Sequence, residues 1–428
     1  MAASMELKRQ QILILAVANV IFTLGFGIII PVLPYYSRNL GADAFILGLL
    51  MASFSLMQFI FAPYWGMLSD RIGRKPVLAI GLAGFGLSFI IFGLSTQLWM
   101  LFVSRIVGGI LSAGIFPASF ALIADITEPG ERGKIMGWMG AAAGLGIIFG
   151  PAICGVFVPF GMSVPFFVAG AIALVTVVAL YAVMPESRAV TIDMHAKKTS
   201  IADSFKAIAT SLKTPIGVFL LLTMLINFAL ACYEGTFSYF LMDRFHLTSE
   251  ALSSVPLLAF LDISIDATGP TLMAFLFTAM GIVMLFGQGI LVGMALKRLK
   301  EEKTVIAGLL LSCAGLVAVL VAPDFVTLLL AACVIGVGSG LVMPSLSSYI
   351  SGRTDKDTQG SALGVMGSYN SLGRIVGPPV GGFAYDVNMI FPYISSSILL
   401  ALGALSVVFI MRASKKEEAE IIAVKPPV

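Results

Sequence analysis

The sequence predicts an all-α integral membrane protein whose twelve transmembrane helices form two pseudo-symmetric bundles of six. Composition is the first observation: 58% of the 428 residues are hydrophobic and only 11% are charged, which excludes an ordinary soluble globular domain. The second is a series of twelve apolar runs, each of about twenty residues, enough to cross a hydrocarbon core of about 30 Å. The third is a repeat of glycine and proline spacings between the two halves.

The apolar runs follow one another with short polar loops between them. They lie near residues 12–36, 44–65, 77–95, 98–121, 135–158, 163–184, 215–241, 271–295, 304–322, 326–350, 361–384 and 390–411. A longer polar stretch separates the sixth run from the seventh and predicts a cytoplasmic linker with a short amphipathic helix at 201–212. The expected organisation is a six-helix bundle over 1–184, a linker over 185–214, and a second bundle with a cytoplasmic tail over 215–428.

The positive charges predict how the helices are oriented. If the N-terminus is cytoplasmic, nearly all lysines and arginines outside the runs fall in inner loops, linker and tail, and only Arg38 and Arg244 fall outside. Cytoplasmic loops carry an excess of these residues. We therefore expect a protein of the plasma or inner membrane with both termini on the cytoplasmic side. The small net charge of +3 is spread over many loops, which gives no basic patch for nucleic acid.

The two halves share a pattern of small residues and prolines. The residues Gly146, Gly150, Pro151 and Gly155 recur at the same intervals as Gly373, Gly377, Pro378 and Gly382. We interpret the halves as parallel repeats related by an axis along the membrane normal. The second half has extra residues in the outer loop 243–270, for which a solvated surface loop, a short lid and an ordered hairpin are all open.

The loop between the second and third runs is dense in charge. Between Gly66 and Pro76 it holds Asp70, Arg71, Arg74 and Lys75. Asp125, at the inner end of the fourth run, is expected to reach Arg74, so that Asp70, Arg74 and Asp125 form a charge network that latches the inner helix ends. The start of the third helix favours an anion at Asp70, and Gly66 permits close approach of a neighbouring helix. The alternative is that these charges only anchor the loop at the headgroups.

The glycines of the fifth run predict close helix packing. Small residues four apart let helix backbones approach, as at Gly146 and Gly150, and Pro151 removes a backbone hydrogen bond and allows a bend. We therefore expect the fifth helix to pack against the eighth, and the eleventh against the second. A tight, bendable interface that seals against proton leak and plain close packing are both open.

Three charged residues lie inside apolar runs: Arg105, Glu234 and Arg374. Charges in the membrane are costly and mark functional sites. Burial raises the pKa of a carboxylic acid, so Glu234 can load and release a proton, or hold a cationic group. It can also be neutralised by an ion pair with Arg374 or reach the outer surface. Arg374 is then the partner of Glu234 or a contact for an anion, and two arginines with one acid predict a net positive cavity.

Four stretches resemble motifs of the major facilitator superfamily. Gly66 to Pro76 resembles motif A, and Gly293 to Arg298 is a decayed copy of it. Arg105 to Gly109 resembles motif B, and Gly146 to Gly155 resembles motif C, which marks drug:proton antiporters in the family. Phe26 to Pro34 is similar to the first-helix pattern of the twelve-helix antiporters. The resemblance covers essentially the whole chain.

The resemblance implies proton-coupled efflux of small lipophilic compounds by alternating access. It ties Arg105 to proton coupling, and it implies that the motif A network stabilises the outward-open state through contact with the eleventh helix. Two departures bear on this expectation. Cys154 stands where motif C usually has a glycine, and Asn19 is the strongly polar residue in the first span, where many drug antiporters have an acid. The proton site is therefore expected to rest on Glu234.

The resemblance also implies which residues bind substrate, because the first, fourth, seventh and tenth helices of this fold face the central pathway. The candidates there and on neighbouring helices are Asn19, Phe22, Phe116, Asn227, Tyr233, Tyr369, Asn370 and Arg374. The same reasoning adds Gln58, Ser112, Gln288, Met343 and Ser347. A pocket rich in Phe and Met with a few polar groups adapts to varied lipophilic ligands.

Other functions remain open from the sequence. The missing first-helix acid favours a uniporter or proton symporter for an organic anion or metabolite, and a transporter-like sensor or scaffold is the alternative from another class. An enzyme is not expected, because no nucleophile and base set or phosphate loop is recognisable, and neither a cofactor nor a metal is predicted. The expected partners are a small-molecule substrate, protons and membrane lipid, with the protein acting as a monomer.

Overall fold

A computed structural model describes residues 2–184, 210–212, 216–249, 252–258, 261–354 and 359–424. Nearly all of the expected linker at 185–214, and most of the amphipathic helix expected within it, lie outside these residues. The described chain is helical apart from one two-stranded sheet.

The first half of the chain forms the helices of the first six crossings. They are α1 (Ala2–Asn39), α2 (Ala44–Ile72), α3 (Arg74–Gly93), α4 (Leu98–Ser112), α5 (Ile115–Ile126), α6 (Pro129–Phe157), the short η1 (Val158–Phe160) and α7 (Val164–Val183). Helix α2 starts after Asp43, whose carboxylate accepts a hydrogen bond from the Ile46 N–H and so satisfies a free donor of the first turn. It ends at Gly73, whose φ of 97° suits a glycine. Helices α4 and α5 together make the fourth crossing.

The second half forms the remaining crossings and the sheet. Its elements are α9 (Gly217–Phe245), β1 (Ser253–Leu258), β2 (Ile263–Ala267), α10 (Gly269–Phe286), the π-helical η3 (Gly287–Leu291), α11 (Val292–Val321), α12 (Phe325–Gly352), α13 (Gln359–Val387) and α14 (Phe391–Val424). Strands β1 and β2 pair antiparallel, so the described part of loop 243–270 contains an ordered pair of strands. Lys300 breaks α11 with a φ of 62°, and this break separates the eighth crossing from the ninth.

The twelve-crossing membrane fold is confirmed. Ten helical segments of the described chain are long and apolar enough to span a membrane. One of them, Gly269–Val321, contains the break at Lys300 and so holds two crossings, and α13 supplies a further one. A helix satisfies its backbone hydrogen bonds internally, which a chain in lipid requires.

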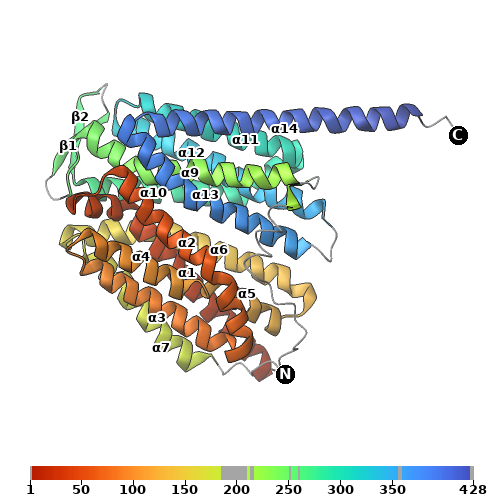
Figure 1. The fold of residues 1–428 in the computed structure, drawn as a ribbon, viewed down its shortest axis with the longest axis horizontal. Coiled ribbons are helices and arrows are strands. Elements are labelled where there is room, and N and C mark those ends of the chain that lie inside the picture. The colour runs from red at the N-terminus through yellow and green to blue at the C-terminus, as the bar shows by residue number, and fades with distance from the viewer. Residues whose placement is uncertain are drawn as a thin grey trace.

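The helices gather into two groups that differ in chain position. Figure 1 shows the helices of the first half, coloured red to yellow, on one side, and those of the second half, green to blue, on the other. We call the end that carries β1 and β2 the hairpin end, and the end toward which both chain termini point the terminal end.

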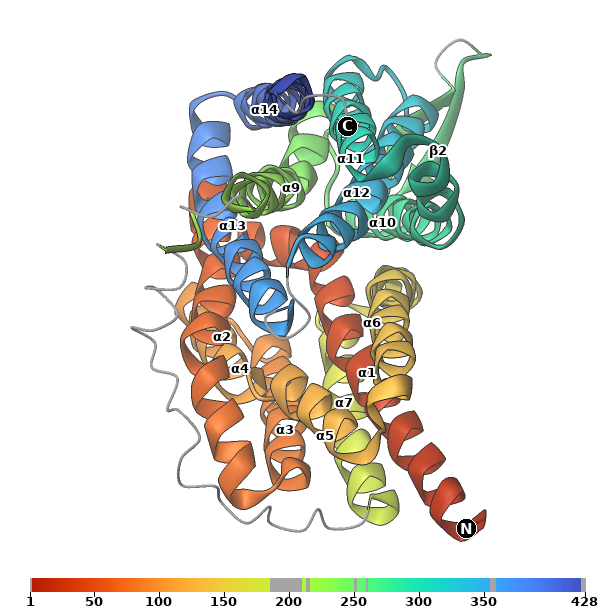
Figure 2. The same ribbon diagram turned by 90° about the vertical axis from the view of Figure 1, so that its right-hand side faces the viewer.

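Two helix pairs make the main contacts between the halves. Helix α2 packs against α13, and α6 packs against α10, as the view along the long axis also shows (Figure 2). These are the second and eleventh crossings and the fifth and eighth, so the pairing expected from the small residues is correct.

Two of the three motif C glycines nevertheless face their own half. A Cβ built on Gly150 would lie 2.5 Å from the Cα of Gly27 in α1. Its counterpart Gly377 behaves alike, because a Cβ there would lie 2.7 Å from the carbonyl oxygen of Phe228 in α9. Gly146 is likewise pressed against α1. These positions hold α6 and α13 against the first helix of their own half.

The third glycine of the motif faces the other half. A Cβ on Gly155 would lie 3.1 Å from the Cβ of Ala274 in α10, and one on Gly382 would lie 2.8 Å from the Cα of Phe45 in α2. The two halves thus use equivalent glycines for equivalent contacts, which gives the sequence repeat a physical basis.

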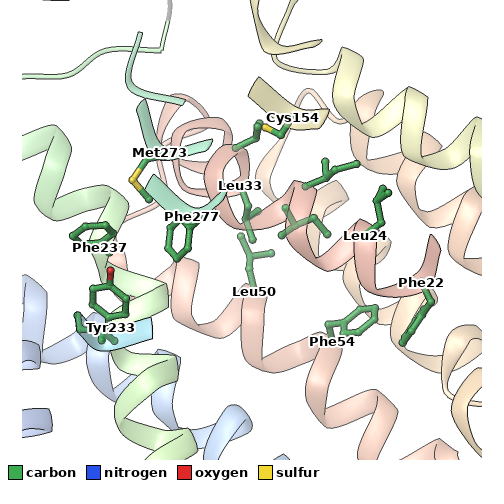
Figure 3. Close-up of a cluster of buried hydrophobic side chains, with 14 of the residues drawn as sticks. Phe22, Leu24, Leu33, Leu50, Phe54, Cys154, Tyr233, Phe237, Met273 and Phe277 are labelled. Atoms are coloured by element: carbon green, nitrogen blue, oxygen red, sulfur yellow. The ribbon is translucent and has the colours of Figure 1, made fainter. Parts of the chain in front are cut away.

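An apolar cluster fills the space between the halves toward the hairpin end. Buried side chains from α1, α2, α9 and α10 belong to it, among them Leu33, Leu50, Phe237 and Phe277 (Figure 3). Burying apolar side chains from both halves stabilises their contact at this end.

Candidate functional site

A cavity of about 850 Å³ lies between the two halves. It is lined by Thr23, Phe26, Ile30, Ser55, Gln58, Phe59, Ala62, Pro63, Gly66, Ala113, Phe116, Pro117, Ala143, Ile147, Asn227, Glu234, Gly364, Gly367, Ser368, Asn370, Ser371 and Arg374. Side chains built on Gly364 or Gly367 would meet nothing within 4 Å. The cavity therefore extends toward the terminal end, while the apolar cluster closes it toward the hairpin end.

The two walls of the cavity differ in chemistry. The wall from α1, α2, α5 and α6 is mostly apolar and carries the rings of Phe26, Phe59 and Phe116. The wall from α9 and α13 consists mainly of polar and charged residues: Asn227, Glu234, Ser368, Asn370, Ser371 and Arg374. A molecule in this cavity would lie between an aromatic surface and a polar one.

Glu234 and Arg374 are the charged residues among the described ones that line the cavity. Arg374 Nη2 and Glu234 Oε2 lie 3.8 Å apart, and the side chains are 41% and 19% exposed respectively. This distance is longer than a hydrogen bond. The two groups are close enough to neutralise each other but leave donor and acceptor positions open to a third partner.

Four of the predicted substrate residues lie in the cavity wall and four do not. Phe116, Asn227, Asn370 and Arg374 line it. The amide of Asn19 instead donates to the Leu15 carbonyl, at 2.8 Å, and to the Ser119 hydroxyl, at 3.2 Å.

The other three are buried elsewhere. Phe22 is enclosed by other phenyl rings, and Tyr233 packs against Phe237. The Tyr369 hydroxyl lies 3.2 Å from that of Ser211.

Some lining residues were not among the candidates. Thr23, Phe26 and Ile30 form one face of α1 toward the cavity. Their spacing of three and four residues is the signal that places side chains on a common helix face, but the sequence offers many such sets and does not say which face looks inward.

Arg105 lies outside the cavity wall. It is only 4% exposed, and its guanidinium carbon sits 5.2 Å from the ring centre of Phe54 and 5.1 Å from that of Phe92. Its Nε has no hydrogen-bond partner among the described atoms. Since Arg105 does not face the cavity, the expected net positive lining is not found: the described wall has one positive and one negative side chain.

The motif A residues come together at the terminal end. Arg74 pairs with Asp70, and its Nε lies 3.2 Å from the Asp125 carboxylate. Arg71 is exposed. A Cβ on Gly66 would have only Pro117 within 4 Å, so α13 does not approach Gly66 in this structure.

A second polar network ties the halves together at the hairpin end. Asp243 of α9 pairs with Arg38 of α1 at 2.7 Å and accepts a hydrogen bond from the Tyr385 hydroxyl at 2.8 Å. Asp386 of α13 accepts from the first backbone N–H groups of α2, at Ala44 and Phe45. The residues Arg38, Asp243, Tyr385 and Asp386 are called the hairpin-end clasp below.

Asp386 is well placed to bind the end of α2. The N–H groups of a first helical turn have no partner within the helix, and the helix dipole favours a negative charge there. The Phe45 N–H lies 2.9 Å from Asp386 Oδ2. A carboxylate on one half thus caps the N-terminus of a helix in the other half.

Comparison with known proteins agrees with this architecture. The family model described as Major Facilitator Superfamily matches residues 15–265 and 261–427. Multidrug resistance protein 2 of Bacillus subtilis is 30% identical over 97% of this chain and 98% of its own length. Quinolone resistance protein NorA of Staphylococcus aureus is 29% identical over 96% of this chain and 98% of its own.

Solved structures share the fold. A crystal structure of the nucleoside transporter NupG superposes with a TM-score of 0.71 at 15% identity, covering 95% of this chain and 99% of its own. The human organic anion transporter MFSD10 gives 0.64 at 21% identity, with 94% and 99% covered. Together with the family match over nearly its whole length, these findings establish that the chain is a multi-pass membrane protein of the major facilitator superfamily.

Proposed function

We propose that the protein is a proton-coupled exporter of small lipophilic compounds that works by alternating access. The observation that carries the proposal is a cavity between two helical groups that is closed at the hairpin end and holds one carboxylate, Glu234, among its described lining residues. A transporter needs such a site, reachable from one face at a time. Near full-length similarity to proteins named for multidrug and quinolone resistance supports the substrate class.

The moving parts are the two bundles, 1–184 and 215–428, joined by the linker 185–214. The protein lies in the plasma membrane with both termini in the cytoplasm. The cavity described above therefore opens toward the cytoplasm, and the hairpin-end clasp closes the outer side. Rocking of the bundles breaks the clasp and brings the terminal ends of α2 and α13 together. There the network of Asp70, Arg74 and Asp125 holds the outward-open state. The protein acts as a monomer.

Glu234 carries the proton in this scheme. The carboxylate holds a cationic group of the substrate, or pairs with Arg374, when the cavity faces inward. After the substrate has left on the outer side, a proton binds the Glu234 carboxylate and the substrate-free carrier returns. The proton then leaves on the inner side, where the next substrate binds. A substrate cation and a proton compete for one group, which couples their movements in opposite directions.

Arg105 contributes to coupling without touching the cavity. Its guanidinium lies over the ring of Phe54, and that ring packs edge-on against Phe26, with the ring centres 5.1 Å apart. Phe26 lines the cavity. A bulky substrate that moves Phe26 would therefore shift the surroundings of the buried charge.

The test uses purified protein in liposomes with a pH-sensitive dye inside and a panel of lipophilic cations, neutral compounds and organic anions outside. We expect proton movement opposite to substrate in the wild type and none in Glu234→Gln. Glu302→Gln is the matched control, because Glu302 pairs with Arg353 and does not line the cavity. Substrate transport without proton movement, unchanged in Glu234→Gln, would refute antiport.

The same experiment tests a second candidate. Arg374 is 41% exposed and lies in the cavity wall, which favours a uniporter or proton symporter for an organic anion. That function would give uptake of the organic anions alone. A uniporter would show no proton movement, and a symporter would show protons moving in the same direction as the anion. Loss of this uptake in Arg374→Gln would then support it.

A further inference from the structure

The cavity presents two opposite charges side by side on a polar wall and faces them with aromatic rings. From this arrangement we propose that its preferred substrates are zwitterionic amphiphiles, in which an anionic group binds Arg374, a nearby ammonium group binds Glu234, and an aromatic body lies against the opposite wall. This inference rests on the proposed transport function and specifies the chemistry of its substrates.

The loose ion pair is the first step. At 3.8 Å the Arg374 and Glu234 side chains do not share a well-formed hydrogen bond. A guanidinium has five N–H donors arranged to hold a carboxylate with two parallel hydrogen bonds, and no other ion pair of Arg374 is found among the described residues. Both groups therefore have capacity for a ligand that the protein itself leaves unused.

The charge balance of the wall is the second step. A simple cation bound to Glu234 takes away the partner of Arg374, and a simple anion bound to Arg374 takes away the partner of Glu234. Either ligand leaves one charge of the wall without its partner, at a modest cost because Arg374 is 41% exposed. A zwitterion replaces one loose pair by two, and the total charge of the site does not change.

The neighbouring polar groups extend the same surface. Asn370 lies four residues before Arg374 on α13, and Asn227 lies seven residues before Glu234 on α9, so each amide shares a helix face with a charge. Amide groups can donate to or accept from a polar head in either orientation. The polar end of a ligand is thus directed to α9 and α13.

The opposite wall selects the body of the ligand. Phe26 and Phe116 line the cavity, and both rings are held by Phe22, whose ring centre is 5.2 Å from each. Rings fixed in this way offer a preformed surface on which a flat aromatic group can stack or pack edge-on. The volume of about 850 Å³ lies within the range of sites for drug-sized molecules.

Four fluorescent derivatives of one compound test the proposal. Nε-dansyl-lysine is a zwitterion with an aromatic body, its methyl ester is a cation, its Nα-acetyl form is an anion, and its Nα-acetyl methyl ester is neutral. Binding of each to the purified full-length protein in lipid nanodiscs is measured by dansyl fluorescence. The body is the same throughout, so differences in affinity report on the two head groups.

We expect the zwitterion to bind about tenfold more tightly than the methyl ester or the acetyl form, as the loss of one charge-assisted hydrogen bond predicts. Arg374→Gln should abolish the preference for the free acid over its ester, and Arg374→Lys should keep part of it. Glu234→Gln should abolish the preference for the free amine over its acetyl form. Arg353→Gln, which changes an arginine that does not line the cavity, should retain both preferences.

The outcomes separate this inference from the function on which it rests. Equal affinity for all four compounds in the wild type, or a preference for the ester that Arg374→Gln does not alter, overturns the zwitterion proposal even if lipophilic cations are exported. A variant that weakens all four compounds equally is merely damaged, and the wild-type ranking then decides. Failure of proton-driven transport for every compound tested refutes the proposed function itself.

Discussion

The two ends of the α2–α13 pair differ sharply in how their glycines are packed. At the hairpin end a Cβ on Gly48 would lie 2.7 Å from the Cα of Pro379, and one on Gly382 would lie 2.8 Å from the Cα of Phe45. At the terminal end Gly66, Gly364 and Gly367 have open space around them. The same two helices are therefore in tight contact at one end and separated at the other.

The α6–α10 pair repeats this contrast. Gly155 and Gly281 contact side chains of the partner helix, at Ala274 and Ile148, whereas Gly137, Gly140 and Gly144, further toward the terminal end, meet nothing within 4 Å.

Two rigid helices that rock about a point cannot be in contact at both ends at once. The contrast suggests that the crowded glycines stabilise this state and that the uncrowded ones become contacts in the opposite state.

The largest expected effect comes from filling a crowded glycine. Gly382→Val places a branched side chain against the backbone of α2, and overpacking of this kind costs about 1–3 kcal/mol, or about 5- to 150-fold in population. We expect the hairpin end to open, which a longer distance between spin labels on the exposed Thr96 and Asn388 would report. Gly364→Val is the matched control, because that site is open here. It should leave the hairpin end closed and slow transport by blocking the other state. The same label distance in both variants would contradict the contrast between the two ends.

A smaller effect is expected at the clasp. Asp386→Asn removes the charge that accepts from two N–H groups of α2. Hydrogen bonds to charged groups are worth about 1.5–3 kcal/mol when buried, and less here because Asp386 is exposed. The label distance should shift partly toward the open form, and Asp266→Asn, which changes an exposed acid in β2, should have no effect. An unchanged distance in Asp386→Asn would mean that the hydrogen bonds to Asp386 do not help to close this end.

The smallest effect in this state is expected at motif A. The side chains of Asp70 and Asp125 are 63% and 40% exposed, and ion pairs at such exposure contribute only about 0.2–1 kcal/mol. Asp70→Asn should therefore leave the hairpin end closed, and under conditions that populate both states it should shift the population further toward the closed form. This is opposite in sign to Asp386→Asn. A shift in the same direction would exclude opposing latches at the two ends.

Much of the site was predictable because its signals are local. The approach of Arg74 to Asp70 and Asp125 follows from loop length and helix ends. The pair of Glu234 and Arg374 was one of the alternatives that the sequence left open. Asn19 and Tyr233 were misplaced for a different reason: each lies on a helix that faces the pathway in part, and the sequence does not give the rotation of that helix. Arg105 was placed near the cavity although phenyl rings enclose it.

The sequence by itself determined the membrane character, the number of crossings and the repeat, because hydropathy and glycine spacing act within single helices. Only the tertiary structure decided which helix faces line the cavity, which charges reach it, and which end is closed. Those features depend on how helices from distant parts of the chain pack together, and the closed end also depends on which of two packings of the same residues is occupied.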